Sequence, residues 1–254
     1  FRVNTGQRFF SPRGMGGRSR CMHCNHALSV LDLVPVFSFV FLKGKCRYCH
    51  AKISIQYPAV ELLAAALSVL VYVSHPLVVG ELINPLPFLF WFVVWMTLLF
   101  VVVYDTKHTI IPWSCSGLLA VLAFFSLFFS FESLHFMMPS MWALLAGPVL
   151  ALPLFLLSLF SAGTWMGWGD SALELSLGWF LGVSLGATAL MLGFWIGAAV
   201  GLVLMALSRI SRLSGFFGYT IRSEMPFAPF LVAGALLAHF FHVDFFSSFG
   251  SLFY

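Results

Sequence analysis

Residues 86–104 read LPFLFWFVVWMTLLFVVVY, a run of 19 residues without a charged side chain. A helix needs about 20 apolar residues to cross the hydrocarbon core of a bilayer. The backbone N–H and C=O groups find no water there, so a spanning segment must pair them internally. The run therefore predicts a transmembrane helix, and a carboxylate, Asp105, follows it directly.

Apolar windows of similar length recur along the chain, separated by proline and glycine break signals, at 57–75, 112–131, 141–163, 184–208 and 226–243. Hydrophobic residues make up 61% of the 254 residues and charged residues 9%, whereas a soluble domain carries about 25% charged residues. The mean hydropathy is +0.98. The composition excludes a soluble domain and predicts an all-α fold, a polytopic transmembrane helical bundle.

The positive charge is concentrated at the start of the chain. Residues 1–57 hold nine of the 13 Lys and Arg side chains and one acid, Asp32. The positive-inside rule therefore predicts that this segment is cytoplasmic, and no signal peptide is visible before it. Nucleic-acid binding is the alternative explanation of a basic patch. We disfavour it and expect no nucleic-acid partner, because membrane lipids with anionic headgroups account for the charge next to a span.

Counting crossings from this segment places Asp105 and residues 167–170 on the cytoplasmic side. The positive-inside rule also assigns three arginines to that side, namely Arg209, Arg212 and Arg222. Two crossings must then lie between Asp170 and Arg209, so we expect a short helix at 171–183, separated from 184–208 by a break at Gly182 to Gly186. The prediction is a cytoplasmic module, 1–56, and a membrane domain, 57–254, of about seven helices.

Two features inside the windows predict packing. Gly193, Gly197 and Gly201 are spaced four residues apart and share one helical face, which favours close contact with a neighbouring helix. Cys115, alone in its window, is expected to be a buried small residue.

Four cysteines predict a metal site in the basic module. Residues 21–24 read CMHC and residues 46–49 read CRYC, with 21 residues between them, which matches a four-thiolate zinc pattern. Disulfides are the alternative, disfavoured by a reducing cytoplasm. Four thiolates complete the zinc shell, so the zinc is structural and the module needs it to fold. The ligands would be Cys21, Cys24, Cys46 and Cys49.

The surroundings of the cysteines complete this prediction. Nearby cations would offset the negative charge of the zinc centre, namely Arg18, Arg20, Lys43, Lys45 and Arg47. Three histidines are expected to lie at the surface or just outside the zinc ligands, because the four thiolates leave no coordination position for them, namely His23, His26 and His50.

Asp105 and Asp170 are candidate catalytic groups. Ionisable side chains at membrane depth are costly and usually functional, and two carboxylates that share a proton can act as acid and base around a water. Gly167 and Gly169, in MGWGDSALE, would let a substrate backbone or a neighbouring helix approach Asp170. The alternative is that each aspartate caps a helix or is an interface charge.

The other acids have simpler interpretations. Glu81, Glu132 and Asp244 lie in or near loops or at the far ends of spans, so we expect their charges to be solvated. Glu224 precedes a helix start, where the helix dipole favours a carboxylate. Glu61, one turn inside the first span, would pair with a basic group or line a site. Glu174 lies one turn beyond Asp170.

The chain resembles the bacterial type IV prepilin peptidases, membrane aspartyl proteases of the Gly-x-Gly-Asp class. The resemblance rests on RSRCMHC, KGKCRYCHAKISIQYPAVELL, YDTKHTIIP, MGWGDSALELSLGWFLG and EMPFAPFLVAGALLA. It implies that Asp105 and Asp170 are catalytic and that the four cysteines bind zinc. The family has a transmembrane helix before the cysteines, a polar residue where Trp113 stands and a basic residue where Ala172 stands.

The resemblance also implies a substrate and a location. The substrate would be the basic leader of type IV prepilins or type II secretion pseudopilin precursors, cut at the cytoplasmic face of the bacterial inner membrane. Many members also N-methylate the new N-terminus with S-adenosylmethionine. Apart from the resemblance, the residues themselves suggest how a basic leader would be positioned: Glu61 and Glu174 would offset the basic groups that repel it, and Gly167 and Gly169 would let its backbone approach. An inactive family member acting as an assembly protein and a channel or transporter are the alternatives.

Overall fold

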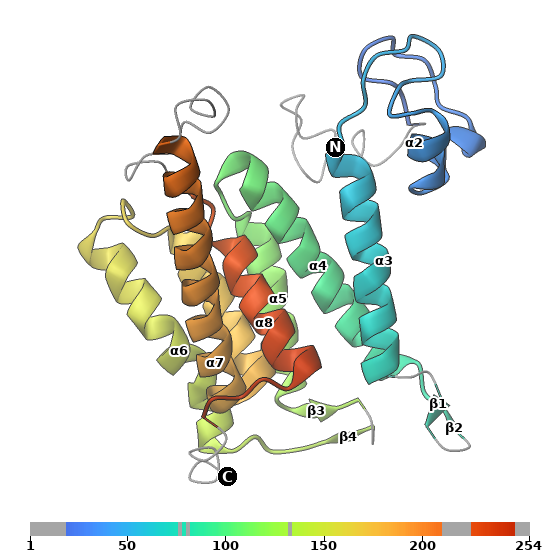
Figure 1. Ribbon diagram of the computed structural model, residues 1–254. Helices are drawn as coiled ribbons and strands as arrows, with labels where there is room; N and C mark the ends of the chain where they lie inside the picture. Colours follow the sequence, from blue (N-terminus) through green and yellow to red (C-terminus); the bar gives the residue numbers. More distant parts are fainter. Residues whose placement is uncertain (1–18, 76–77, 80–81, 132–133, 210–224, 247–254) are drawn as a thin grey trace. The chain divides into compact units, whose positions relative to one another are not determined.

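The structure, a computed structural model, describes residues 19–75, 78–79, 82–131, 134–209 and 225–246 (Figure 1). The chain forms two compact units, Phe1–Ala66 and Leu67–Tyr254. The predictions for Arg18, Glu81, Glu132, Arg212, Arg222 and Glu224, and for the side chain of Arg209, lie outside the described residues.

The first unit contains the cysteine module and the beginning of a long helix. A 3-10 helix, η2 (Val30–Leu33), precedes α2 (Phe37–Phe41). Isolated β-bridges join Arg20 to Ala27 and Lys45 to Lys52, so each bridge closes one Cys-x-x-Cys turn. The long helix α3 (Gln56–Ser74) then begins, at the last residue of the predicted module.

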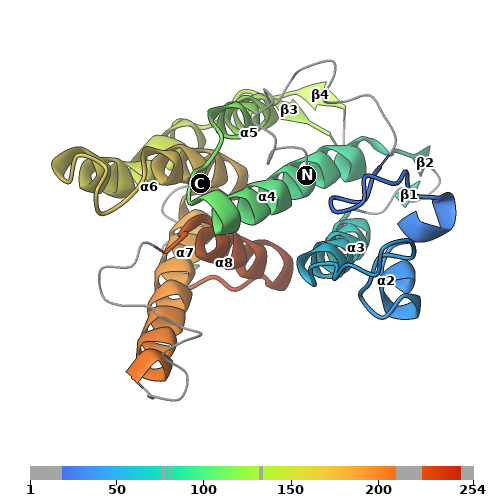
Figure 2. The ribbon, with the colours of Figure 1, turned by 90° about the horizontal axis from the view of Figure 1, so that it is seen from above.

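The second unit is a helical bundle with two small hairpins (Figures 1 and 2). Its helices are α4 (Leu86–His108), α5 (Trp113–Ser126), α6 (Met141–Phe160), α7 (Trp168–Arg209) and α8 (Ala228–Phe241). The antiparallel hairpins are β1 (Val78–Val79) with β2 (Leu82–Ile83), and β3 (Phe129–Ser130) with β4 (His135–Phe136).

The predicted class of fold, an all-α polytopic membrane bundle, is confirmed. Within the described residues, four helices are long and apolar enough to cross a membrane, namely α3, α4, α6 and residues 168–206 of α7. The apolar helices α5 and α8 have 14 residues each.

The helix α7 reverses direction at Gly182. This residue has φ 76° and ψ −178°, a left-handed φ that suits glycine. A Cβ placed on Gly186 would lie 3.5 Å from the Cα of Gly178, whereas eight residues of a straight helix span about 12 Å. The chain therefore folds back, and the predicted break between 171–183 and 184–208 is confirmed, with the first segment beginning at Trp168.

Glycines bring the second segment of α7 against α8. A Cβ on Gly193 would lie 3.1 Å from the Cα of Leu231, and a Cβ on Gly197 would lie 3.2 Å from the Phe230 ring. A Cβ on Gly201 would lie 3.8 Å from the Met225 Sδ. The three glycines therefore share one packing face, as predicted, and Cys115 is buried, as predicted.

Several helix ends differ from the predicted windows. The helix α4 continues through Asp105 to His108, where Thr109 adopts the left-handed conformation and its N–H donates to the Asp105 carbonyl at 2.7 Å. Asp105 therefore lies in the last turn of a helix. The helix α5 ends at Ser126, five residues before the end of its window, because the chain turns there into the β3–β4 hairpin.

Asp244 lies in the loop after α8, as predicted, but it is half-buried and bonded within the protein rather than left to solvent. Its carboxylate accepts hydrogen bonds from the Ser184 hydroxyl at 2.7 and 2.8 Å and from the Phe246 N–H at 2.8 Å. The buried Thr188 hydroxyl accepts from the Phe245 N–H at 3.1 Å. These bonds tie the chain after α8 to the second segment of α7, so Asp244 is a structural anchor.

The close helix contacts predict different effects for two glycine substitutions. A Cβ on Gly234 would overlap the Ala189 carbonyl oxygen and lie 2.8 Å from the Gly193 nitrogen, whereas a Cβ on Gly117 meets nothing within 4 Å. We expect Gly234→Ala to lower the free energy of unfolding by about 1–3 kcal/mol through overpacking. Gly117→Ala, the matched control, should not destabilise the protein. Thermal unfolding in detergent measures both, and equal melting temperatures would contradict this packing.

Candidate functional site

Asp105 is held against the start of α8. Its side chain is buried, and its Oδ2 accepts a hydrogen bond from the Ala228 N–H at 3.2 Å. Ala228 is the first residue of α8, and the first N–H groups of a helix have no partner within the helix and carry a partial positive charge. The backbone of α8 therefore fixes one oxygen of Asp105, a contact that the sequence did not reveal.

Asp170 lies in the first turn of α7, as its third residue. Its Oδ2 accepts a hydrogen bond from the Gly167 N–H at 3.2 Å, the backbone contact that an acid makes at this position of a capping box. The Ser158 hydroxyl of α6 donates to the Gly167 carbonyl at 3.3 Å. The capping role considered for Asp170 is thus observed, and it involves one of the two carboxylate oxygens.

The contact between Ile111 and Gly169 brings the two aspartates together. A Cβ on Gly169 would lie 2.8 Å from the Cβ of Ile111, a buried residue six positions after Asp105. The beginning of α7 therefore lies against the segment that follows α4. The Asp105 and Asp170 carboxylates are close enough to interact electrostatically.

The two predicted glycines have different surroundings. The missing side chain of Gly169 makes room for Ile111, so this glycine allows the approach of a neighbouring segment. Gly167 is exposed, and a Cβ there would meet only Asp170 Oδ2 at 3.3 Å and the Gly169 nitrogen at 3.9 Å. Gly167 is therefore open to solvent beside the Asp170 carboxylate.

Glu174 is a third carboxyl group in the same helix, one turn after Asp170. Its side chain is fully buried, and within the described residues neither carboxyl oxygen has a hydrogen-bond partner. The Ser116 hydroxyl of α5 is also buried without such a partner. Ile111, just before α5, contacts Gly169 at the start of α7, and Phe124 of α5 contacts Trp179 farther along α7. Ser116 and Glu174 lie between these two contacts, at a similar depth.

Glu61 belongs to the first unit and has a structural partner there. Its Oε2 accepts a hydrogen bond from the Val36 N–H at 2.7 Å. Val36 is the residue before α2 and has a positive φ of 59°. Glu61 therefore joins the start of α2 to the second turn of α3.

The four cysteines of the module converge on one point. Their Sγ atoms all lie within 4.8 Å of one another, and the Cys21 and Cys49 Sγ atoms are 3.8 Å apart. A tetrahedron with metal–sulfur bonds of about 2.3 Å has sulfur–sulfur edges of about 3.8 Å. All four thiols are free of disulfides, and His23, His26 and His50 are exposed, as predicted. The donor set therefore fits a tetrahedral, thiolate-binding metal ion.

The backbone of the two knuckles supports thiolate ligands. In each knuckle the N–H of the first cysteine donates to the carbonyl five residues later, from Cys21 to His26 at 3.0 Å and from Cys46 to Ala51 at 2.9 Å. The backbone N–H groups of Cys24 and His23 lower the pKa of Cys21 to about 6.

The thiols also oppose one another's ionisation. The backbone N–H of Ala51 lowers the pKa of Cys49, but burial and the other three thiols raise it to about 12. Four thiolates at these distances therefore require a bound cation.

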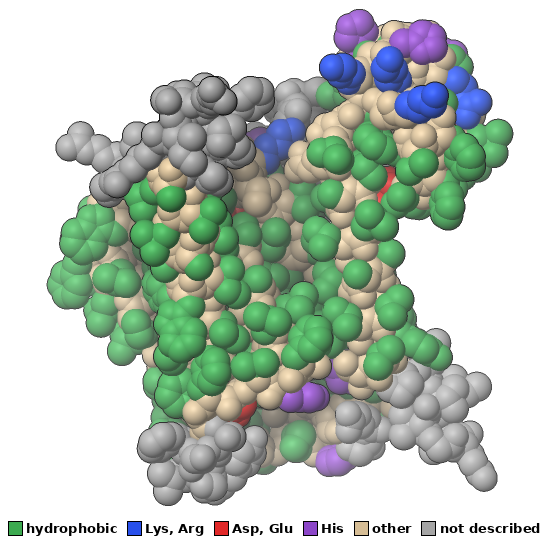
Figure 3. All heavy atoms as spheres, viewed as in Figure 1, with side chains coloured by type: hydrophobic (Ala, Val, Ile, Leu, Met, Phe, Trp, Pro, Cys, Tyr) green, Lys and Arg blue, Asp and Glu red, His purple; other side chains and the backbone are tan. Residues whose placement is uncertain are grey.

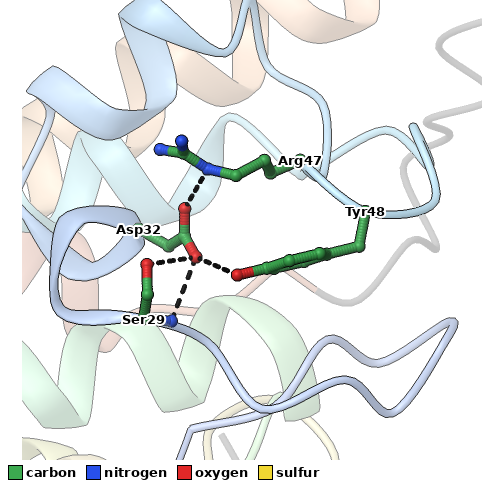
Figure 4. Close-up of polar contacts among 4 residues, drawn as sticks. All are labelled: Ser29, Asp32, Arg47 and Tyr48. Atoms are coloured by element: carbon green, nitrogen blue, oxygen red, sulfur yellow. Dashed lines mark hydrogen bonds and ion pairs between the residues drawn. The ribbon is translucent and has the colours of Figure 1, made fainter.

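Asp32 organises the polar interior of the module (Figure 4). Its carboxylate accepts hydrogen bonds from Arg47 Nε at 2.7 Å, from the Ser29 hydroxyl and N–H at 2.8 and 3.0 Å, and from the Tyr48 hydroxyl at 3.2 Å. Burial raises the pKa of Asp32, but the Ser29 hydrogen bonds and the Arg47 charge lower it to about 2.

These bonds connect η2 to the second knuckle. Arg47, expected to offset the metal charge, is instead paired with Asp32. The one available signal in the sequence was that Asp32 is the single acid of the basic segment.

Comparisons with known proteins agree with this arrangement. Residues 8–75 match the family model described as Bacterial Peptidase A24 N-terminal domain. The chain is 32% identical over 227 residues to a prepilin leader peptidase/N-methyltransferase of Bacillus subtilis (strain 168), a match that covers 88% of this chain and 82% of that protein.

Shorter matches carry the same name. A protein of Dichelobacter nodosus is 39% identical over 45% of this chain and 39% of its own length, and one of Aeromonas hydrophila is 54% identical over 21% and 19%. No solved structure matches the chain. Because the Bacillus subtilis match spans most of both proteins, the chain belongs to the family of prepilin leader peptidases/N-methyltransferases.

Proposed function

We propose that this chain is a membrane aspartyl endopeptidase that cleaves the leader peptide of type IV prepilins or type II secretion pseudopilins. The observation that carries the proposal is the proximity of two buried carboxylates, Asp105 and Asp170, at the end of the bundle where Ile111 meets Gly169. The name of the relatives, prepilin leader peptidase/N-methyltransferase, supports the substrate class. N-methylation with S-adenosylmethionine stays a prediction of the resemblance.

The two carboxyl groups would act as an acid–base pair that shares one proton. The ionised carboxylate takes a proton from a water molecule as the water attacks the scissile carbonyl carbon. The protonated carboxyl donates its proton to the carbonyl oxygen, which gives a neutral tetrahedral diol. Collapse of the diol breaks the C–N bond: the leaving amine takes a proton from the protonated carboxyl of the pair, and the ionised carboxylate takes the proton of one diol hydroxyl, which leaves a carboxylic acid and restores the single shared proton.

The backbone contacts of the pair would keep it ready for this chemistry. The Ala228 N–H holds Asp105 Oδ2 and the Gly167 N–H holds Asp170 Oδ2, so among the residues that the structure describes one oxygen of each carboxylate is bonded to the backbone. The other oxygen of each would be directed at the water and the scissile carbonyl. The open space beside Gly167 would admit the substrate backbone. We propose that this end of the bundle faces the cytoplasm in the bacterial inner membrane.

We further propose that Cys21, Cys24, Cys46 and Cys49 hold a structural zinc ion. Zinc takes four thiolates in a tetrahedron at the distances that the cysteines offer. When bound, it would offset part of the negative charge of the thiolates and fix the two knuckles, and with all four positions filled it would have no place for substrate.

Replacement of either aspartate tests the acid–base pair. Asp105→Asn and Asp170→Asn keep the side-chain shape and one acceptor oxygen, so both variants should fold. Since each removes one carboxyl of the pair, we expect each to reduce cleavage of a prepilin by at least about 100-fold in a reconstituted assay. Asp244→Asn, the matched control at the opposite end of α8 from Ala228, should keep cleavage activity even if its melting temperature falls. Substantial cleavage by either the Asp105→Asn or the Asp170→Asn variant would contradict the assignment of these residues as the catalytic acid–base pair.

Replacement of a single cysteine tests the zinc site. Cys46→Ser removes one thiolate, so the purified variant should lose the zinc that we expect at one ion per chain and should become sensitive to proteolysis within the module. Cys115→Ala, a cysteine outside the cluster, should keep its zinc. Elemental analysis of protein purified under reducing conditions measures both, and wild-type protein without zinc would refute the assignment.

Glu174 offers a test of a positioning role. A buried carboxyl without a partner destabilises a fold by about 1–3 kcal/mol, so Glu174→Leu should raise the melting temperature. We propose that Glu174 influences the pair from one turn below Asp170. Because its buried side chain does not reach a bound leader, Glu174→Leu should lower kcat and leave KM unchanged.

The alternatives for Glu174 give different kinetics. A direct contact with the basic leader, as the charge of these acids suggests, would instead raise KM in Glu174→Leu, as it would in Glu61→Gln. Unchanged kcat and KM in a stabilised Glu174→Leu variant would exclude any role in the reaction.

A further inference from the structure

The helices η2 and α2 expose an unusual amount of apolar surface for a small polar module. Neither helix contains a buried residue, and five of their side chains are each at least 64% exposed, namely Val30, Leu31, Phe37, Val40 and Phe41. We call these five side chains the apolar surface. A contiguous exposed apolar patch marks an interaction site.

A hydrogen bond sets the depth of this surface along α3. The Val36 N–H, at the start of α2, is bonded to Glu61 in the second turn of α3, a helix that is long and apolar enough to cross the membrane. Glu61 lies five residues after Gln56, which is about 7.5 Å along a helix. Amphipathic segments that lie in the membrane interface bury their apolar side chains about 5–10 Å deep. If α3 enters the leaflet at its first residue, Gln56, the Val36–Glu61 hydrogen bond holds the start of α2 at interfacial depth.

Positive charge flanks the apolar surface. Lys43, Lys45 and Lys52 are exposed and follow α2 closely, and Lys45 and Lys52 are partners in a β-bridge. The one acid among residues 19–55, Asp32, is bonded to Arg47 and does not offset these lysines. Figure 3 shows blue Lys and Arg side chains over the module, beside green apolar side chains. Lysines at this position attract anionic lipid headgroups.

We propose that η2 and α2 form a membrane-docking surface. The apolar surface inserts into the interface of the leaflet that α3 enters, and Lys43, Lys45 and Lys52 contact the headgroups of anionic phospholipids. The module then has two attachments to the bilayer, the covalent one through α3 and the lipid contact of α2. The Val36–Glu61 hydrogen bond would fix the module at one depth.

Photocrosslinking of the full chain tests this proposal. The photoreactive amino acid p-benzoylphenylalanine replaces Phe41 in one variant and Phe37 in another, and Met22 in a matched control. Met22 is an exposed apolar residue of the first knuckle, 66% exposed against 65% for Phe37. Each variant is reconstituted in vesicles of phosphatidylethanolamine and phosphatidylglycerol, checked for the metal content of the wild type and irradiated. Mass spectrometry identifies the adducts.

We expect phospholipid adducts at positions 37 and 41, in yields several-fold above that at position 22. The yield should fall when phosphatidylcholine replaces phosphatidylglycerol, and also when Lys43, Lys45 and Lys52 are changed to Gln. Adducts at 37 and 41 that join two copies of the chain, or two segments of one chain, would overturn the proposal in favour of a protein partner. Equal lipid adducts at all three positions, or none at 37 and 41, would also overturn it.

Discussion

The contact between Ile111 and Gly169 is the constraint on which the candidate site depends. A side chain at position 169 would collide with Ile111, so the beginning of α7 can lie against the α4–α5 connection only because residue 169 is glycine. That contact joins two segments that each carry an aspartate a few residues away. It brings together two acids, each with its own backbone partner, and in the proposed mechanism these two acids share a proton.

The same principle of close backbone approach extends through the bundle. Gly147 and Gly178 allow α6 to approach the first segment of α7, and Gly193 and Gly234 allow α8 to approach the second. Helices in lipid gain little from apolar burial, so small residues that permit tight van der Waals contact carry much of the association. Because α7 reverses direction at Gly182, this one helix provides both the segment that packs against α6 and the segment that packs against α8. The position of Ala228 near Asp105 is a consequence of this packing, because α8 is seated on glycines of α7.

Local patterns predicted the parts of the molecule that depend on local chemistry. The apolar windows located the long helices, the two knuckles identified the four cysteines, and the orientation of three arginines required a break that the structure has at Gly182. Contacts between distant segments were not predictable in this way. The Ala228 N–H on Asp105, the Ser184 hydroxyl on Asp244 and the Arg47 bond to Asp32 each depend on how separate elements pack. For the same reason nothing in the local sequence indicated that the Glu174 side chain would be fully buried.

The most direct test of the account is the binding of a prepilin peptide whose scissile amide is replaced by a hydroxyethylene group. This group imitates the tetrahedral diol and would place its hydroxyl between Asp105 and Asp170. The account predicts competitive inhibition at least about 100-fold tighter than binding of the ordinary peptide, as for transition-state analogues in general. It also predicts that this advantage disappears in both Asp105→Asn and Asp170→Asn. An analogue that binds no more tightly than the ordinary peptide, or equally well to the wild type and both variants, would contradict a shared aspartyl site.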